Sequence, residues 1–199
     1  TLDGIAVLFH DTNLLRLMSV DAKVSELTFA ELSSYSLPNK GKVPSLDQVL
    51  RELPGVMLNI DVKSAGAVSP TVRAIEENSA HDRVLVSSFS NTRRKRALAL
   101  LSRPVATSGS MADVLRIWVA HKFLGGFGLK ALTQGLNALQ LPCNYGPILF
   151  AQPKFIAAMA AIDIEVHFWT INELEQMREL LSMGASGIVT DRCDLAAKL

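Results

Sequence analysis

Ile5-Ala6-Val7-Leu8-Phe9-His10-Asp11 is an apolar stretch that ends in a histidine and an aspartate. Its residue types predict a β-strand over Ile5–Phe9. In α/β barrels the catalytic groups lie at the C-terminal ends of the strands, and His10 stands at such an end. An imidazole there can donate or accept a proton near neutral pH. A histidine on an apolar strand is more often structural, so both interpretations stay open.

The same alternation of a short apolar run and a helix-spaced run recurs along the chain. Between the runs stand helix-start signals such as Ser90 and the pair Gln152-Pro153. Further strands are predicted at Val56–Val62, Arg83–Ser87, Val105–Thr107, Ala138–Leu141, Glu165–Trp169 and Gly187–Val189, and helices at Ser45–Leu53, Thr71–Asn78, Asn91–Leu101, Lys154–Ala161 and Glu173–Met183.

Strands that alternate with helices predict a parallel sheet with helices packed outside it. About seven strands are one unit short of a (β/α)8 barrel, which typically needs roughly 250 residues. We therefore expect residues 1–199 to form one α/β domain, a TIM (β/α)8-type barrel that lacks the first strand-helix unit and the start of the second strand. An open doubly wound sheet is the alternative, and no Gly-x-Gly-x-x-Gly follows a strand to support it. Between Asp113 and Gln134 we expect a long loop over the barrel rim, with an extra helix or a lid as alternatives.

Composition narrows the classes of partner. The net charge of +1 provides no global field to recruit nucleic acid or an anionic membrane. The basic run Arg93–Arg96 has no interleaved aromatics and is interpreted as a solvated face, with weak attraction of an anionic substrate as the alternative. No run is long and apolar enough to span a bilayer. Cys143 and Cys193 do not make a disulfide framework, which is compatible with a reducing cytoplasm.

Asn59, Asp61 and Lys63 alternate along the predicted second strand and so share one face. An acid and a base on the inward face of a barrel strand are costly unless they are paired or bind an ion. Asp61 with a neighbouring Lys63 suits a hard cation and a phosphate oxygen. A surface edge strand would tolerate the same pattern, although the flanking apolar residues argue against it.

Two later segments end strands in polar or aromatic residues. His167 and Trp169 share a face, and Trp169 can stack on a ligand or fill the core, which the spacing leaves equally open. Asn172 is predicted to cap the following helix. At the end of the last strand, Asp191 is predicted to cap a turn.

Taken together, these segments resemble the glycerophosphodiester phosphodiesterase family. The resemblance covers the whole chain in the family's order, and the ordered set is specific although each motif alone is weak. The matching residues are Thr1-x-Asp3-Gly4, Val7 with His10-Asp11, Val43-Pro44-Ser45-Leu46, Leu58-Asn59-Ile60-Asp61-Val62-Lys63, Ser87-Ser88-Phe89, Ala138-Leu139-Gln140-Leu141-Pro142, Phe168-Trp169-Thr170-Ile171-Asn172, and Gly184-x-x-Gly187-Ile188-Val189-Thr190-Asp191.

The resemblance implies a TIM-barrel phosphodiesterase that uses a divalent cation, Mg²⁺ or Ca²⁺, and cleaves glycerophosphodiesters into an alcohol and glycerol 3-phosphate. His10 matches the second of the family's two catalytic histidines. Asp61 matches a metal-ligand position where many members have Glu. Lys63 matches the basic residue beside the phosphate, and Trp169 matches the aromatic at the glycerol end of the pocket.

Residues 1–199 depart from the family pattern at their beginning. The family's His-Arg-Gly strand, its Glu-Asn-Thr helix start and its Glu-x-Asp strand have no counterpart among them. We therefore expect part of the site to be missing and no hydrolysis of glycerophosphocholine by these residues alone. A non-catalytic remnant that binds phosphodiesters or a partner protein is the alternative, and an unrelated sugar-phosphate-binding barrel a weaker one. Dimerisation could cover the strand edges that an incomplete barrel exposes.

Overall fold

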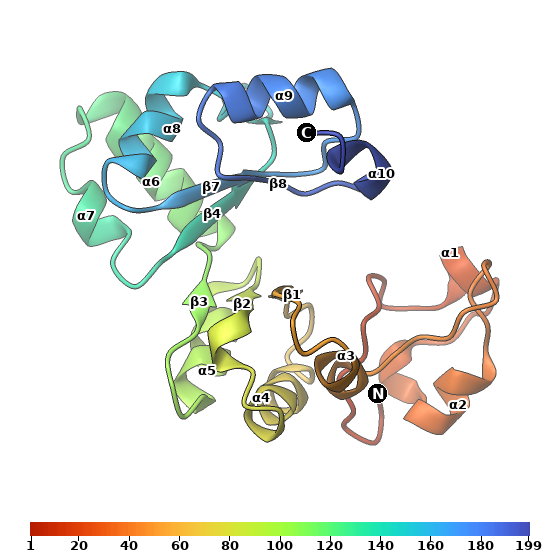
Figure 1. The fold of residues 1–199 in the computed structure, drawn as a ribbon. Helices are drawn as coiled ribbons and strands as arrows, with labels where there is room; N and C mark the ends of the chain where they lie inside the picture. Colours follow the sequence, from red (N-terminus) through yellow and green to blue (C-terminus); the bar gives the residue numbers. More distant parts are fainter. The chain divides into compact units, whose positions relative to one another are not determined.

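The computed structural model describes residues 1–199, in which short strands alternate with helices (Figure 1). The chain is an α/β protein. It divides into two compact units, Thr1–Val105 (unit 1, red to yellow-green in Figure 1) and Ala106–Leu199 (unit 2, green to blue). Whether the whole chain acts as one barrel domain stays a prediction.

Unit 1 is built on a parallel ladder between β1 (Leu58–Asp61) and β2 (Val84–Ser87). Ile60 lies opposite Val86, and both are buried. Three of the helices of unit 1 pack in a row, in which the middle one, α4, contacts the other two. They are α3 (Leu46–Glu52), α4 (Val68–Glu77) and α5 (Asn91–Leu100).

The predicted strand at Ile5–Phe9 is wrong. The segment makes a single antiparallel bridge, from Val7 to Ser45. Leu8 donates its N–H to the Pro44 carbonyl at 3.0 Å, and Ala6 accepts from the N–H of Leu46 at 2.8 Å. The ladder stops there because Ser45 is the N-cap of α3, where the partner segment turns helical.

Three short helices surround a small separate core in the first 45 residues. This core is formed by Leu14, Leu32 and Val43. The helices are α1 (Leu15–Met18), the 3-10 turn η1 (Val24–Glu26) and α2 (Phe29–Ser34).

A polar cluster ties the end of α4 to the chain that follows α5. Glu76 accepts the backbone N–H of Ser102 at 2.6 Å and its hydroxyl at 2.7 Å. These bonds lower the pKa of the Glu76 carboxyl to about 2. The buried His81, in the 3-10 turn η2 (His81–Arg83), lies 3.1 Å from the same carboxylate. The contact gives the buried imidazole a hydrogen-bond partner and holds η2, which leads directly into β2, against the end of α4.

Unit 2 contains a second parallel sheet. In it β7 (Glu165–Phe168) lies between β4 (Ala138–Leu141) and β8 (Gly187–Ile188). The chain after β3 (Ala106–Thr107) joins this sheet through a parallel bridge from Ser108 to Ala138. The remaining elements of unit 2 are α6 (Met111–Phe123), α7 (Leu129–Leu132), β5 (Asn144–Tyr145), β6 (Ile148–Leu149), α8 (Pro153–Ala160), α9 (Leu174–Ser182) and α10 (Cys193–Ala196).

The expectation of a long loop between Asp113 and Gln134 is wrong, and the alternative of an extra helix is correct. The segment lies largely in α6 and α7. Ser110 and Asp113 form a capping box that starts α6. Val114 and Ile117 then fall on one buried face, so the helix is stabilised by packing as well as by its cap.

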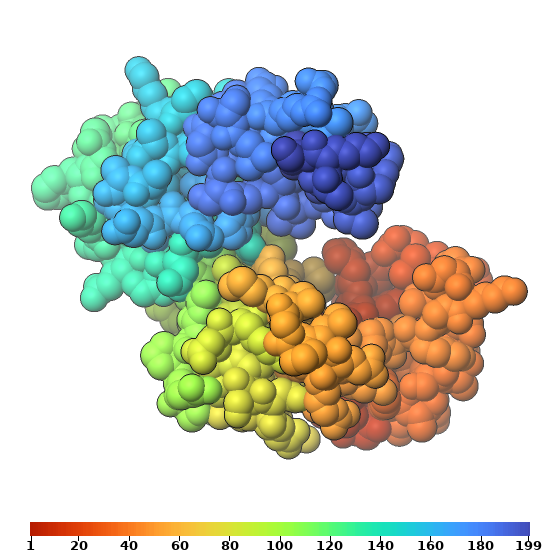
Figure 2. All heavy atoms as spheres, viewed as in Figure 1, coloured from red at the N-terminus to blue at the C-terminus, as the bar shows by residue number.

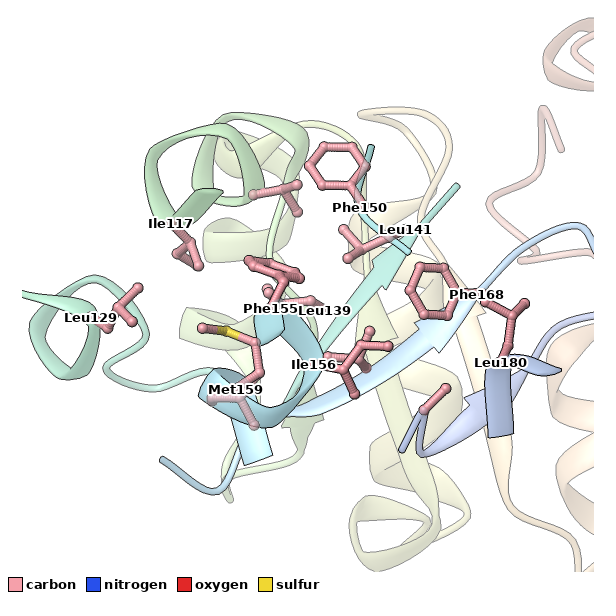
Figure 3. Packing of buried hydrophobic residues seen from close by; sticks show 14 of the residues in the cluster. Ile117, Leu129, Leu139, Leu141, Phe150, Phe155, Ile156, Met159, Phe168 and Leu180 are labelled. Atoms are coloured by element: carbon pink, nitrogen blue, oxygen red, sulfur yellow. The ribbon is translucent and has the colours of Figure 1, made fainter. Parts of the chain in front are cut away.

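The core of unit 2 lies between its sheet and its helices. In Figure 3, Ile117 from α6 and Leu129 from α7 point toward Phe155 and Met159 of α8. Phe155 is 1 % exposed. Its ring centroid lies 6.3 Å from that of Phe150, so aromatic side chains join α8 to the segment that follows β6.

Most predicted element ends are right within a few residues, and the exceptions have local causes. β1 starts at Leu58 rather than Val56 because the Arg83 guanidinium binds the carbonyls of Leu53 and Val56 and holds a turn there. α4 starts at Val68, before the predicted Thr71. The antiparallel pair β5 and β6 was not predicted.

The interpretation of Arg93–Arg96 as a solvated face is only partly right. Lys95 and Arg96 are exposed, but Arg94 is buried and donates to the side chain of Asn91 at 2.9 Å. Cys143 and Cys193 are free thiols.

Phe155→Ala tests the core of unit 2. We expect the free energy of unfolding to fall by about 3–5 kcal/mol, because the change removes a buried ring and leaves a cavity. Both tryptophans, Trp118 and Trp169, belong to unit 2, so their fluorescence during urea unfolding reports on this unit. The control is Phe127→Ala, at an exposed position, which should change stability by about 0.5 kcal/mol or less. Equal effects of the two changes would contradict this description of the core.

Candidate functional site

A pocket of about 320 Å³ opens in unit 1, between residues 5–12 and the segment of β1 that continues to Ser64. His10, Asp61 and Lys63 all line it. The structure therefore brings together three of the four site residues predicted from the sequence. Much of the remaining lining is apolar, from residues such as Val7 and Ile60, as is common where a few polar groups orient a ligand.

Asp61 and Lys63 form an ion pair on the pocket wall. The Lys63 ammonium lies 2.8 Å from Asp61 Oδ2. Their side chains leave the same face because they stand two residues apart on extended chain. Both remain partly exposed, so a ligand can reach the ammonium. Asn59, from the same face, also lines the pocket.

His10 is held by the residue that follows it. Its Nδ1 lies 2.8 Å from Asp11 Oδ1, and its side chain is 75 % exposed. Arg16, from α1, donates to both oxygens of Asp11, at 2.6 and 3.0 Å. The bonds from Arg16, and then that from His10, lower the pKa of the Asp11 carboxyl to about 2.

These bonds decide which ring nitrogen of His10 is free. Asp11 is ionised at neutral pH and can only accept hydrogen bonds. The Nδ1 of His10 must therefore carry the proton that it shares with Asp11, which leaves Nε2 as the free nitrogen. The sequence prediction included His10 but missed the role of Arg16. No local pattern marks that role, because it depends on α1 turning back toward Asp11.

Trp169, the fourth predicted residue, belongs to unit 2 and follows β7 directly. Its backbone N–H donates to the Leu141 carbonyl at 2.9 Å, and its side chain is partly buried. On the same strand, His167 lies 2.9 Å from Glu165 Oε2, and a side chain at Gly187 would meet its ring at 2.9 Å. Contacts with Leu141, Glu165 and Gly187 within unit 2 thus hold β7 and the backbone of Trp169 in place.

The predicted capping role of Asn172 is wrong. Glu173 occupies the N-cap position of α9, and Asn172 joins the chain after β7 to the chain after β8. Its side-chain oxygen accepts the Thr190 hydroxyl and the Asp191 N–H, each at 3.0 Å. Its amide nitrogen donates to Asp191 Oδ2 at 3.2 Å.

Thr190, rather than Asp191, caps the turn that follows β8. The Thr190 hydroxyl accepts the N–H of Arg192 at 2.9 Å. Asp191 was predicted for this role, but its carboxylate is paired with the amide of Asn172.

The chain offers few ligands to a metal ion. No group of three His, Cys, Asp or Glu side chains in residues 1–199 is arranged to hold one. Mg²⁺, however, is commonly bound by one or two carboxylates together with waters and substrate phosphates. Asp61 fits the role of one such carboxylate, since Lys63 contacts only its Oδ2.

The sequence profile of the glycerophosphoryl diester phosphodiesterase family matches residues 1–195. The chain belongs to this family. The resemblance inferred from the ordered motifs is thus confirmed, and the chain is a hydrolase of the glycerophosphodiester phosphodiesterase type.

Individual glycerophosphodiester phosphodiesterases agree with this assignment. A Mycobacterium tuberculosis protein named "Probable glycerophosphodiester phosphodiesterase 2" is 36 % identical over 196 residues, which cover 98 % of this chain and 74 % of the relative. A Bacillus altitudinis glycerophosphodiester phosphodiesterase is 25 % identical over 226 residues, which cover 100 % of this chain and 82 % of the relative.

Solved structures of the family share the fold. A glycerophosphodiester phosphodiesterase from Agrobacterium tumefaciens matches with a TM-score of 0.77 at 17 % identity, over 100 % of this chain and 82 % of that one. A phosphodiesterase from Oleispira antarctica, in complex with the product sn-glycerol-3-phosphate, matches with a TM-score of 0.73 at 20 % identity, over 96 % and 77 %. At such identities the likeness establishes the fold, that of TIM-barrel glycerophosphodiester phosphodiesterases.

Arg16→Ala tests the arrangement around His10. Without the guanidinium, the pKa of Asp11 should rise from about 2 toward its ordinary value of 3.8. The carboxylate then keeps its charge above that value and loses it as the pH falls through it, so the bond to His10 is lost at a higher pH than in the parent protein. A carbon-detected NMR titration of the Asp11 carboxyl measures the shift.

A matched control for this titration lies in unit 2. Asp194 also has a pKa of about 2, because Arg192 binds it, and its titration should not change in Arg16→Ala. An Asp11 titration identical in parent and variant would show that Arg16 does not hold the carboxylate in solution.

Proposed function

We propose that the pocket of unit 1 binds a glycerophosphodiester and takes part in its hydrolysis to an alcohol and glycerol 3-phosphate. The observation that carries the proposal is that His10, Asp61 and Lys63, up to 53 positions apart in the sequence, line this one pocket in a chain of the glycerophosphodiester phosphodiesterase family. The Oleispira phosphodiesterase, bound to sn-glycerol-3-phosphate, supports this product class.

In this proposal His10 transfers a proton during cleavage. Cleavage of a phosphodiester requires a base that removes a proton from the attacking hydroxyl and an acid that protonates the leaving oxygen. The Asp11 carboxylate orients the imidazole, while Nε2 exchanges the proton with the reacting oxygen. Arg16 is a positioning residue, since it acts on His10 through Asp11.

Lys63 is proposed to bind a non-bridging oxygen of the phosphate. An ammonium at the wall of a largely apolar pocket attracts a phosphate more strongly than it would in open water. Asp61 holds the ammonium in place before the ligand arrives. The resemblance to the family assigns Trp169 to the glycerol end of the substrate, and this assignment stays a proposal.

The family generally uses a divalent cation, and we propose that Asp61 supplies one carboxylate ligand for Mg²⁺ or Ca²⁺. A bound cation would neutralise charge on the phosphate oxygens. The shorter side chain of Asp, where many members have Glu, would bind through one oxygen or through water. We also propose that the protein acts in the cytoplasm and that it can self-associate.

A second candidate function is phosphodiester binding without turnover. One observation favours it: His10 is the single histidine that lines the pocket, whereas the reaction needs both an acid and a base. For that reason we expect residues 1–199 alone to bind glycerol 3-phosphate without hydrolysing glycerophosphocholine. Turnover by these residues at ordinary enzyme rates would contradict the expectation.

His10→Ala separates catalysis from binding. We expect the His10→Ala change, made in a longer protein that contains these residues and hydrolyses glycerophosphocholine, to lower kcat on the order of 10²–10⁴-fold, because a proton-transfer group is lost. The affinity for glycerol 3-phosphate, measured by calorimetry, should change by less than about threefold, since the phosphate contact is assigned to Lys63. An unchanged kcat would place the proton transfer on another residue.

Lys63→Ala is the matched variant in the same experiment. It should weaken glycerol 3-phosphate binding about tenfold or more, because a charged hydrogen bond to phosphate is lost. Lys95→Ala removes an exposed lysine of α5 and should leave binding unchanged. If the two lysine variants bind alike, the phosphate does not lie at Lys63.

Asp61→Ala tests the cation. Titration of the chain with Mg²⁺ or Ca²⁺, followed by calorimetry with glycerol 3-phosphate present, should show weaker metal binding in the variant by about tenfold or more. Asp82→Ala, at an exposed carboxylate of η2, is the control. Equal metal affinities in the parent protein and Asp61→Ala would remove Asp61 from the ligand set.

A further inference from the structure

Charge is distributed unevenly along the chain. Between Asp113 and Asp163 there is no acidic residue, while the same segment carries four basic ones. The whole-chain net charge of +1 conceals this excess. The basic residues are Arg116, Lys122, Lys130 and Lys154.

In the middle of this segment the chain exposes three large apolar side chains. Phe123 is 69 % exposed, Leu124 58 % and Phe127 83 %. We call these three residues the apolar tip. They lie at the end of α6 and in the turn to α7, and the green region at the margin of unit 2 in Figure 2 is this part of the chain. None of them contributes to the core of unit 2.

The exposure of the apolar tip is imposed by the fold. Gly126 donates its N–H to the Ala120 carbonyl at 3.0 Å, and Phe127 donates to the Leu124 carbonyl at 3.0 Å, so the turn closes on the end of α6. Gly125, Gly126 and Gly128 adopt positive φ angles of 58°, 85° and 80°, which favour glycine.

Buried residues on both sides anchor this turn. Ile117 precedes the apolar tip and Leu129 follows it, and Figure 3 shows both pointing into the core of unit 2. Phe123 also packs edge-on against Trp118, with ring centroids 5.8 Å apart. The fold therefore presents apolar side chains on a hydrogen-bonded turn between two helices that are anchored in the core.

Two cations accompany the apolar tip. Lys122 precedes Phe123, Lys130 lies three residues after Phe127, and both are exposed and make no ion pair within the chain. Exposed aromatic and leucine side chains beside lysines match the composition of peripheral membrane anchors. The apolar groups enter the boundary between headgroups and acyl chains, while lysine ammonium groups remain at the level of anionic phosphates.

We propose that the apolar tip, together with Lys122 and Lys130, binds the surface of a membrane that contains anionic phospholipids. Lys122 and Lys130 favour an anionic surface as the partner, because the sequence between Asp113 and Asp163 has no carboxylate, although Asp163 lines the same hollow as Lys130. The proposal does not depend on the assignment of the catalytic residues. Such binding is peripheral, and none of the helices is both long and apolar enough to cross a bilayer.

Sedimentation with vesicles tests this surface. We expect the chain to bind vesicles of phosphatidylcholine mixed with phosphatidylglycerol, and to bind pure phosphatidylcholine at least tenfold more weakly. Phe123→Ser combined with Phe127→Ser should reduce binding to the anionic vesicles about tenfold or more. Lys122→Gln and Lys130→Gln should each reduce it about fivefold, and added salt should reproduce that loss.

Matched controls use exposed residues of unit 1. Met57→Ser removes an apolar side chain that is also highly exposed, and Lys95→Gln combined with Arg96→Gln removes two exposed cations. Both should bind as the parent protein does. Circular dichroism confirms that each variant is folded before it is compared.

Three results would overturn the proposal. The first is equal binding to neutral and anionic vesicles. The second is a control variant that loses as much binding as the variants of the apolar tip. The third is the absence of vesicle binding together with a dimer, in analytical ultracentrifugation, that Phe127→Ser dissociates, which would assign the apolar tip to contact with a second copy of the chain.

Discussion

Two serine hydroxyls help to keep the pocket-lining chain extended beyond the end of β1. The Ser87 hydroxyl donates to the Ile60 carbonyl at 3.3 Å, and the Ser88 hydroxyl donates to the Val62 carbonyl at 2.7 Å. The Val62 N–H donates in turn to the Ser87 carbonyl at 2.8 Å. These bonds hold the chain extended past the last residue of β1, so Asp61 and Lys63 keep the same side.

The two sides of the pocket achieve order by different means. Around Asp61 the backbone is fixed by the parallel ladder with β2. Around His10 the backbone forms almost no β-ladder. The side chains provide the order there, because Arg16 donates hydrogen bonds to Asp11 and Asp11 is hydrogen-bonded to the imidazole. The first side is rigid because of buried backbone bonds, whereas the second depends on charges that water can screen.

The sequence predicted what depends on local pattern. The run Ala138–Leu141 is a strand with the predicted ends, and Asp61 and Lys63 share a face because alternation along extended chain leaves no other arrangement. Features that depend on distant partners were missed. Ile5–Phe9 has the composition of a strand, but its neighbour becomes helical at Ser45. The bond from Arg16 to Asp11 likewise requires a chain reversal that no local signal reports. The start of α6, in contrast, has a local signal, because Ser110 and Asp113 form a capping box.

The hydrogen bonds that the Asn172 side chain makes to Thr190 and Asp191 have a chemical consequence. The amide serves as donor and acceptor at once, and its donor faces the carboxylate of Asp191. Slow deamidation would convert that amide to a second carboxylate and set two negative charges against each other at hydrogen-bonding distance. Ageing of the protein at this single side chain would therefore loosen the chain beyond β7 and β8, the region that immediately follows Trp169, without any change to the buried core.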